Sequence, residues 1–485
     1  MKKFLSWAVL SALLGAALAA VGDELLLPEI GDPTGALFTP DQERELGEAF
    51  FRGLHNQVQI SEDPEITDYI QSVGQKLAAN SDNPEQNYTF FIVVSPDINA
   101  FAGPGGYIGV NSGLLLTSES ESELASVLAH EIAHVTQRHL YQAFDAAKKM
   151  SIPSAAAMLG AILLGTQSPQ LGQAALIAAQ AGMVQMQINF TRDNEQEADR
   201  VGMQTLSRSE FDPRAMPLFF DRLQQSTRYV GRELPEFLRT HPVTVSRIAD
   251  TRARSESFPY RQYPDSLGYQ MARARLKAEA AGDAAETQRY FEASIGQGTS
   301  GQRDVARYGL ALTLLGRNKT AEARPLLEPL VAKYPEYPQF INALARVELA
   351  ASRHEKALGL YGQALSRFPG NRAVLIEYSK AQLAAGNAEL ARKSLLAYLR
   401  DHKVNAETNQ LLAEAYTKLG NESEGHRYMA EYYYLNGQTR AAITQLRIAA
   451  KAARGNFYLY SMVDERLRQL EAEEEERRKA KGFMH

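Results

Sequence analysis

The chain has 485 residues, with 52 lysine and arginine residues against 57 aspartate and glutamate residues, so its formal net charge is −5. Its 45% apolar and 22% charged residues are typical of a globular protein with room for about three domains. The mild acidic excess argues against nucleic-acid binding, and the absence of cysteine excludes disulfides, thiolate metal sites and a cysteine nucleophile. Histidine and carboxylate side chains must therefore hold any metal.

The first 19 residues have the pattern of a secretory signal peptide. Lys2 and Lys3 precede an apolar run that ends in small residues, and we predict cleavage after Ala19. The run is shorter than the ~20 apolar residues of a membrane-spanning helix. The sequence therefore predicts an exported protein, which for a leader of this bacterial type means a periplasmic one.

Two helices and two strands are expected in the first part of the mature chain. Thr39-Pro40 and Asp63-Pro64 each combine a capping residue with a proline, which is typical of the start of a helix. Residues 88–94 are rich in aromatic and β-branched side chains, and residues 107–110 form a second short run of this kind. A glycine-rich stretch, 101–106, separates the two strands.

Further helices are predicted along the chain to residue 254. One helix should extend from Ser118 to about Tyr141, because Ser118 and Glu121 have the spacing of a capping box. Residues 152–186 carry no charge and predict a pair of packed helices, with a mobile cover or a peripheral contact to membrane or client protein as the alternative. Helical patterns follow at 192–208, 213–225 and 244–254.

The last part of the chain contains a repeat. Small residues recur at 34-residue intervals, as do an aromatic-proline pair and a turn position: Ala323, Ala357, Ala391 and Gly425; Tyr334 and Phe368; Ser352, Gly386 and Gly420. This period is typical of tetratricopeptide repeats, in which paired helices stack into a solenoid. We predict a linker at 256–266 and an α-helical repeat domain at 267–485.

The segment from His130 to His134 contains an H-E-x-x-H motif inside the predicted helix. The two histidines lie about 40° apart on one helix face at ~100° per residue, so both rings can bind one ion. Glu131 lies between them and can take a proton from a water molecule at that ion. The two histidines could instead be hydrogen-bonded core residues.

A pair of carboxylates supplies the rest of a metal site. Glu195 and Asp199 are four residues apart on another predicted helix, so they face the same way. One can complete a site with two histidines and a carboxylate, as ligand Glu195, while Asp199 accepts the free N–H of a ligand histidine. Such acidic runs are more often solvated, but together with the histidine motif this pair predicts one Zn²⁺ per chain.

These motifs resemble the HtpX-type and CAAX-prenyl-protease zinc metallopeptidases over residues 30–255. The likeness includes the stretches 99–107 and 190–192 and the tripeptide Thr240-His241-Pro242. It implies a mainly α-helical, zincin-like peptidase domain at 20–255 with a small β-sheet, followed here by the repeat solenoid. It also implies amide hydrolysis in which zinc polarises the scissile carbonyl and Glu131 acts as general base.

The resemblance places the edge of the substrate cleft in the stretch from Asn99 to Val110, including Gly105, Gly106 and Tyr107. An exposed strand edge can bind an extended peptide through its backbone, although a purely structural glycine turn is the alternative. His241 is expected to take part in catalysis, with a local structural histidine as the alternative. It could donate to the developing oxyanion or occupy the open position of the zinc and silence the enzyme.

Three functions remain open from the sequence. The resemblance, together with the leader and the repeats, implies an endopeptidase whose repeat domain docks to the outer-membrane β-barrel assembly machinery and whose clients are stalled or misassembled outer-membrane proteins. A chaperone or assembly adaptor with little proteolysis is the main alternative. A peptidase for small secreted substrates, which would remain active after removal of the repeats at about residue 265, is a weaker one.

Overall fold

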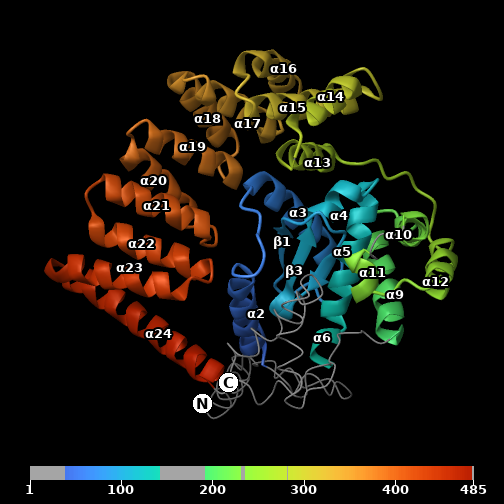
Figure 1. Ribbon diagram of the computed structural model, residues 1–485, viewed down its shortest axis with the longest axis horizontal. Coiled ribbons are helices and arrows are strands. Elements are labelled where there is room, and N and C mark those ends of the chain that lie inside the picture. The colour runs from blue at the N-terminus through green and yellow to red at the C-terminus, as the bar shows by residue number, and fades with distance from the viewer. Residues whose placement is uncertain (1–38, 143–191, 231–234, 281, 483–485) are drawn as a thin grey trace, which may run out of the picture. The chain divides into compact units, whose positions relative to one another are not determined.

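The computed structural model describes residues 39–142, 192–230, 235–280 and 282–482 (Figure 1). The predicted signal peptide at 1–19 and the uncharged stretch at 152–186 lie outside these residues. Within the described ranges, no helix has both the length and the apolar character needed to span a membrane.

A three-stranded sheet lies at the centre of the predicted peptidase domain, whose described residues up to 255 are called the peptidase part below. Its order is β1 (Thr89–Val93), β3 (Tyr107–Asn111) and β2 (Ala100–Ala102), with β1 parallel and β2 antiparallel to β3. The sequence predicted β1 and β3 but not β2, because a three-residue strand is too short to show a periodic pattern. Within the stretch 99–110, β2 lies at one edge of the sheet and Tyr107 lies on the central strand. That this stretch borders the substrate cleft stays a prediction.

Helices surround this sheet and form one core with it (Figure 1). Apolar side chains of α3 and α5 pack on the sheet, and residues of α9, α10, α11 and α12 extend the same core. These helices, with α2, α4 and α6, have the bounds α2 Pro40–Leu54, α3 Pro64–Ala78, α4 Ser112–Thr117, α5 Glu121–Thr136, α6 His139–Gln142, α9 Arg192–Arg208, α10 Ala215–Val230, α11 Glu236–Thr240 and α12 Val245–Ser255.

The helix that carries the histidine motif is shorter than the sequence predicted. Ser120, not Ser118, is its N-cap, and the Ser120 side chain accepts a hydrogen bond from the backbone N–H of Glu123. Ser118 ends α4 instead. At the other end, Arg138 adopts a positive φ of 55°, which stops α5 and redirects the chain into α6.

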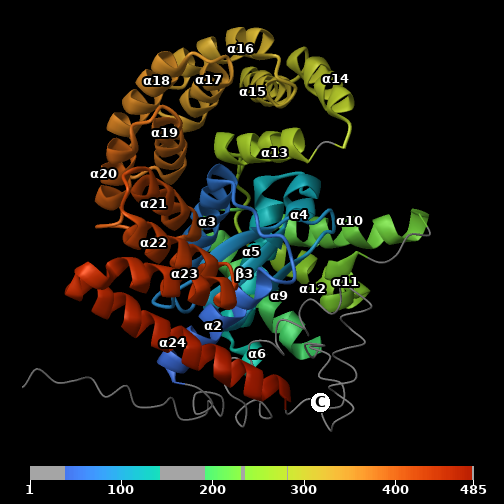
Figure 2. The ribbon, with the colours of Figure 1, turned by 60° about the vertical axis from the view of Figure 1, so that its left-hand side comes forward.

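The second half of the described chain is the expected helical array (Figure 2). Successive helices pack on one another, from α13 to α24. Their bounds are α13 Leu267–Glu279, α14 Ala284–Ile295, α15 Ser300–Gly316, α16 Thr320–Lys333, α17 Pro338–Ala350, α18 His354–Arg367, α19 Arg372–Ala384, α20 Ala388–Tyr398, α21 Ala406–Lys418, α22 Glu422–Leu435, α23 Thr439–Ala452 and α24 Phe457–Gly482. The predicted mainly α-helical fold, a domain with a small β-sheet followed by a helical solenoid, is confirmed.

The 34-residue period has a structural cause. Ser352, Gly386 and Gly420 each end a helix with a positive φ, of 60°, 83° and 75°. Asn318, another 34 residues earlier, does the same with a φ of 59°. Because left-handed residues reverse the chain within a short turn, small or polar residues recur at these positions.

Helix α13 joins the two parts of the molecule. Tyr269, Ala272 and Leu276 belong to the core of the peptidase part, whereas Met271 and Ala274 pack with the first helices of the array. Residues 259–266 precede α13 without helical structure. We propose the division at 256–266 as a boundary in the sequence, with α13 shared by the two packing units.

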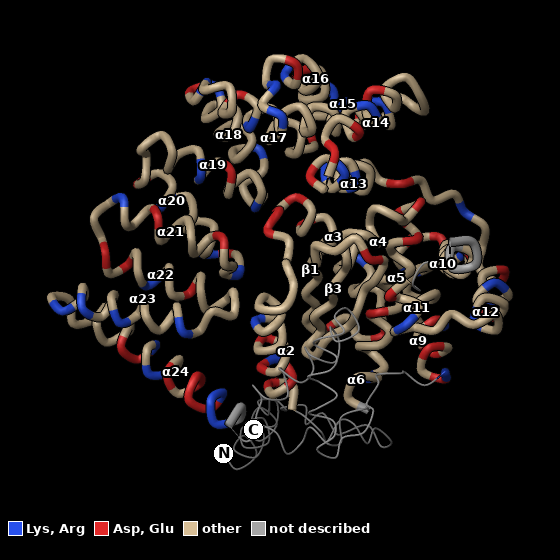
Figure 3. The backbone as a smooth tube through the Cα atoms, in the orientation of Figure 1, with Lys and Arg blue, Asp and Glu red and all other residues tan. Residues whose placement is uncertain are grey.

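The far end of the array also contacts the peptidase part. The guanidinium of Arg52 on α2 lies 4.5 Å from the ring centroid of Tyr434, and Asn56 donates to the Gly437 carbonyl. Both charge signs alternate along α24 (Figure 3), where Arg466 pairs with Glu431 of α22 at 2.8 Å. The array and the peptidase part thus meet at α2 as well as at α13.

Candidate metal centre

Helix α5 presents His130, Glu131 and His134 at the core. All three are at most 1% exposed. Helix α9 approaches α5 closely because it has glycine at position 202, where a Cβ atom would lie 3.2 Å from the Ala129 carbonyl oxygen. This close contact between helices brings the α9 carboxylates within reach of the histidines.

Glu195 and Asp199 contact the histidines from α9. Asp199 Oδ1 lies 3.0 Å from Nδ1 of His130, which leaves Nε2 of that ring facing the centre of the cluster. The carboxylate oxygens of Glu195 lie 3.5 Å from Nε2 of His130 and 3.5 Å from Nε2 of His134. The two helices therefore hold both predicted pairs face to face.

His241 completes a group of four. Its Nδ1 lies 3.0 Å from Glu195 Oε1 and 3.4 Å from Nε2 of His130, while Nε2 atoms of His130 and His134 are 3.0 Å apart. The four donor atoms all lie within 4.8 Å of one another. Bonds of ~2.05 Å from a tetrahedral zinc give ligand-to-ligand distances of ~3.3 Å, and the measured separations lie around this value. The residues present fit one tetrahedral metal ion.

Arg247 was not predicted from the sequence, and it connects the carboxylates. Its Nε and Nη2 donate to Asp199 at 2.8 and 2.7 Å, and Nη1 lies 2.7 Å from Glu195 Oε2. Nη1 also donates to the Pro242 carbonyl, next to His241. One buried guanidinium thus ties α9 to the turn that carries His241.

His139 of α6 lies behind His134. Their Nδ1 atoms are 2.9 Å apart, and Nε2 of His139 is 3.4 Å from Glu197. Hydrogen bonds on the outer nitrogen fix the orientation of a ligand histidine. His139 reaches the site because Arg138 adopts a left-handed conformation, which turns α6 back toward the site.

The charges in the cluster favour a cation. Burial opposes protonation of His130, but the hydrogen bonds of Asp199 and Glu195 outweigh it and raise the pKa to about 9. Burial, followed by the charge of His130, lowers the pKa of His134 well below its usual value. Although burial opposes ionisation of Glu195, His241 and His130 hold its pKa well below the usual range. The carboxylate field that attracts a proton to His130 also attracts a metal ion.

Glu131 points toward β2 and His241. Its Oε1 is 3.5 Å from Nε2 of His241, and burial raises its pKa despite a hydrogen bond with the Ala102 backbone. Asn99 precedes β2, is buried, and accepts a backbone hydrogen bond from Asn111. The edge strand β2 therefore lies beside the predicted general base.

The glycine turn between β2 and β3 has the backbone that only glycine adopts readily. Gly105 and Gly106 have φ angles of 67° and 78°, and a Cβ at Gly106 would lie 2.2 Å from the Asn87 carbonyl oxygen. Tyr141 of α6 binds the Gly105 N–H through its hydroxyl at 3.2 Å. Tyr107 stacks on Phe51 of α2. The turn is thus fixed by α2 and α6.

Comparisons with known proteins match both parts of the chain. Residues 64–255 match Peptidase family M48, and residues 348–414 match a tetratricopeptide repeat. The chain is 34% identical over 444 residues to the β-barrel assembly-enhancing protease of Escherichia coli, covering 92% of this chain and 91% of that protein. It is 34% identical over 445 residues to the Yersinia pestis protein of the same name, with the same coverage.

A second similarity covers a smaller share of the chain. The mitochondrial metalloendopeptidase OMA1 of Schizosaccharomyces pombe is 31% identical over 181 residues, which cover 37% of this chain and 50% of that protein. The similarity to the bacterial proteins, in contrast, extends through the repeats.

Proposed function

The chain belongs to peptidase family M48 and is a metallopeptidase, and from this premise we propose that it is a periplasmic zinc endopeptidase acting in outer-membrane protein assembly. The observation that carries the proposal is the group of His130, His134, Glu195 and His241, whose donor atoms have the mutual distances of a tetrahedral zinc site. The absence of cysteine supports this nitrogen and oxygen ligand set.

In this proposal His130, His134 and Glu195 hold the zinc ion, one per chain. A zinc ion there would supply Lewis-acid polarisation of the scissile carbonyl and a lowered pKa for water. Glu131 accepts the proton of the attacking water and delivers it to the leaving amine. Burial raises the pKa of Glu131 above its usual value, which makes the carboxylate a stronger base.

The remaining members of the site position these groups. Asp199 binds Nδ1 of His130, and its contact with Arg247 keeps it ionised, since that guanidinium outweighs the effect of burial and lowers the pKa of Asp199. A ligand ring with its outer nitrogen bound in this way presents Nε2 in one fixed direction.

His241 is proposed to occupy the fourth position at rest. Its Nδ1 lies 3.0 Å from Glu195 Oε1 and 3.4 Å from His130 Nε2. These distances lie in the same range as those among the other three ligands, 3.0 to 3.5 Å. A substrate carbonyl would have to displace it, which would make the resting enzyme latent. The alternative role, donation to the oxyanion, requires the ring to lie outside the group of ligands.

We propose that substrate adds as an extended segment along the free edge of β2. The Ala102 backbone is close to Glu131, so a peptide paired with β2 would bring its scissile carbonyl next to the water whose proton Glu131 accepts. Asn99, Gly105, Gly106 and Tyr107 shape this region: the glycine turn fixes the end of β2, and Tyr107 anchors it to α2. Backbone pairing selects extended chains rather than particular side chains, which suits unfolded clients.

The repeat array is proposed to dock the enzyme to its partners. The Escherichia coli and Yersinia pestis relatives bear the name β-barrel assembly-enhancing protease and match nearly the whole chain. By this similarity the partners are the outer-membrane β-barrel assembly machinery and its stalled or misassembled clients. Cleavage of the leader after Ala19 would deliver the chain to that compartment.

A chaperone or assembly adaptor with latent proteolysis is the second candidate. The burial of the whole ligand group, with His241 at most 2% exposed, favours a resting state of low activity. The endopeptidase needs Glu131 as its general base, whereas the chaperone or adaptor does not.

The test combines metal content with a substitution that preserves shape. We expect one zinc per purified wild-type chain and per Glu131→Gln chain, with cleavage of an unfolded outer-membrane protein only by the wild type. In a strain lacking the gene, Glu131→Gln should fail to restore assembly. Full rescue by Glu131→Gln would favour the adaptor, and a chain that binds no zinc would refute the enzyme.

A further inference from the structure

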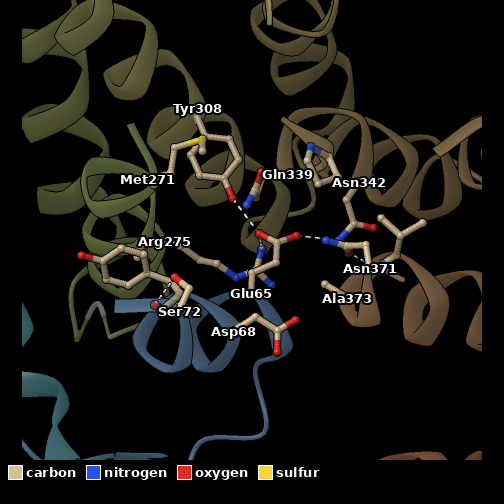
Figure 4. Close-up of a pocket in the computed structure, with 15 residues that line it drawn as sticks. Glu65, Asp68, Ser72, Met271, Arg275, Tyr308, Gln339, Asn342, Asn371 and Ala373 are labelled. Carbon is tan, nitrogen blue, oxygen red and sulfur yellow. Dashed lines mark hydrogen bonds and ion pairs between the residues drawn. The ribbon is translucent and has the colours of Figure 1, made fainter. Parts of the chain in front are cut away.

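A pocket of about 190 Å³ lies between α3 of the peptidase part and helices α13, α15, α17 and α19 of the array (Figure 4). It is separate from the ligand group, whose residues do not line it. Its walls combine carboxylates, amides and apolar side chains. Such a mixture is typical of a binding site with a few oriented polar groups.

Three hydrogen-bond donors at this pocket already bind the Glu65 carboxylate. Glu65 accepts from Arg275 at 2.8 Å, from Tyr308 at 3.0 Å and from the Asn342 amide nitrogen at 2.5 Å. Figure 4 shows these three groups converging on the Glu65 carboxylate. The remaining nitrogens of Arg275 pair with Asp63. These three contacts fix the Glu65 carboxyl at the base of the pocket, where burial raises its pKa.

Two buried acceptors remain without a partner. They are Oδ1 of Asn342 and Oε1 of Gln339, one turn apart on α17. Asn342 is 1% exposed, and its orientation is fixed because its nitrogen donates to Glu65. A buried acceptor without a partner costs about 1–3 kcal/mol. A ligand that fills the pocket would therefore be held by donors directed at these two oxygens.

The two free acceptors and the apolar wall narrow the class of ligand. Glu65 and Asp68 also line the pocket, and each carboxylate already has an arginine beside it at 2.8 Å, Arg275 at Glu65 and Arg372 at Asp68. Met271, Ala272 and Val374 form a buried apolar wall in the same pocket. A lysine side chain has this complementary form, with an apolar stem and an ammonium group that has three donors and no acceptor.

We propose that this pocket binds a lysine side chain of an extended client segment, with the ammonium group at Asn342 and Gln339 and the stem along Met271 and Val374. The proposal rests on the proposed function, because it assigns client binding to the junction of array and peptidase. It makes this junction a second contact for a substrate, apart from β2.

The probe is the capped peptide acetyl-Ala-Ala-Lys-Ala-Ala-amide, with norleucine in place of lysine as the apolar control. Binding to the full mature chain carrying Glu131→Gln, which spares the peptide, is measured by ligand-observed NMR. We expect the norleucine peptide to bind at least about tenfold more weakly, since hydrogen bonds to a charged group contribute ~1.5–3 kcal/mol. Equal binding of the two peptides would overturn the proposal.

Gln339→Met removes one acceptor, keeps the side-chain length and leaves the three donors of Glu65 in place. It should weaken the lysine peptide about tenfold, whereas the matched change Gln410→Met on an exposed position of α21 should not. Binding of free 1,5-diaminopentane as tightly as the peptide would assign the pocket to small amines and overturn its role in client binding. Zinc content and cleavage of a short unfolded substrate by the chain with an unaltered pocket test the metal centre separately, so failure of the pocket proposal is distinct from failure of the metal centre.

Discussion

Arg247 binds both oxygens of the Asp199 carboxylate, with Nε 2.8 Å from Oδ2 and Nη2 2.7 Å from Oδ1. Because the third nitrogen of the same guanidinium reaches Glu195, a single side chain fixes a proposed metal ligand and the carboxylate that orients another. A planar fork of this kind cannot be replaced by the point charge of lysine.

Arg247→Lys should therefore weaken zinc binding while the chain stays folded. Loss of groups that orient metal ligands typically costs about 10–100-fold in affinity, which competition with a chromogenic chelator would measure. Arg247→Met should also lower stability by about 3–5 kcal/mol, because it leaves two buried carboxylates without their cation. Wild-type zinc affinity in Arg247→Lys would show that Arg247 has only a structural role.

His241→Ala should raise basal cleavage of an unfolded protein, by roughly tenfold or more if the displaced state is a minor one. The reason is that His241 Nδ1 lies among the proposed ligands, where it competes with substrate. Initial rates with equal zinc loading test this. A lower kcat with unchanged zinc content would instead assign His241 to the oxyanion.

Removal of the repeats at residue 265 should unfold the peptidase part rather than release it. Tyr269, Ala272 and Leu276 of α13 belong to the peptidase core, and the Tyr269 hydroxyl donates to the Ser118 carbonyl beside the start of α5. Loss of each large core side chain costs about 2–5 kcal/mol. A fragment of residues 20–280, which retains α13, should keep a cooperative thermal transition, whereas the fragment of residues 20–265 should not. Equal transitions in the two fragments would contradict this assignment of α13.

The sequence predicts those parts of the site that are local in the chain. His130 and His134, like Glu195 and Asp199, are four residues apart on one helix, and this spacing alone places each pair on one face. Arg247 could not be found this way, because it lies 48 residues from Asp199 and an arginine on a helix is usually solvated. Its role depends on the packing of α12 against α9.

Short elements and exact helix ends were also beyond the sequence. Residues 100–102 pair as β2 only because β3 is beside them, and tertiary context decides such short strands. Ser118 and Ser120 are both good caps, and the chain uses Ser120 because α4 extends to Thr117. The 34-residue period, by contrast, predicted the array because a left-handed turn recurs at Ser352, Gly386 and Gly420.

The pH dependence of stability should include a contribution from Glu279 at the junction of α13. Partial burial, followed by the charge of Asp63, raises the pKa of Glu279 from 4.5 to about 7, although its side chain is 43% exposed and Arg275 lies 3.4 Å away. Because the folded state binds this proton more tightly than the unfolded state, protonation of Glu279 favours folding. This contribution is complete below about pH 4.5 and is lost as the pH rises through about 7.

Glu279→Gln imitates the protonated form, so it should raise the melting temperature relative to the wild type at pH 8 and lose that advantage toward pH 5. Thermal unfolding of both chains across this range gives the difference directly, and contributions of other groups cancel. Glu355→Gln, at an exposed carboxylate of α18, serves as the control and should change little with pH. A Glu279→Gln difference that grows toward acid pH would have the wrong sign and would mean that Arg275, rather than burial and Asp63, decides the ionisation of Glu279.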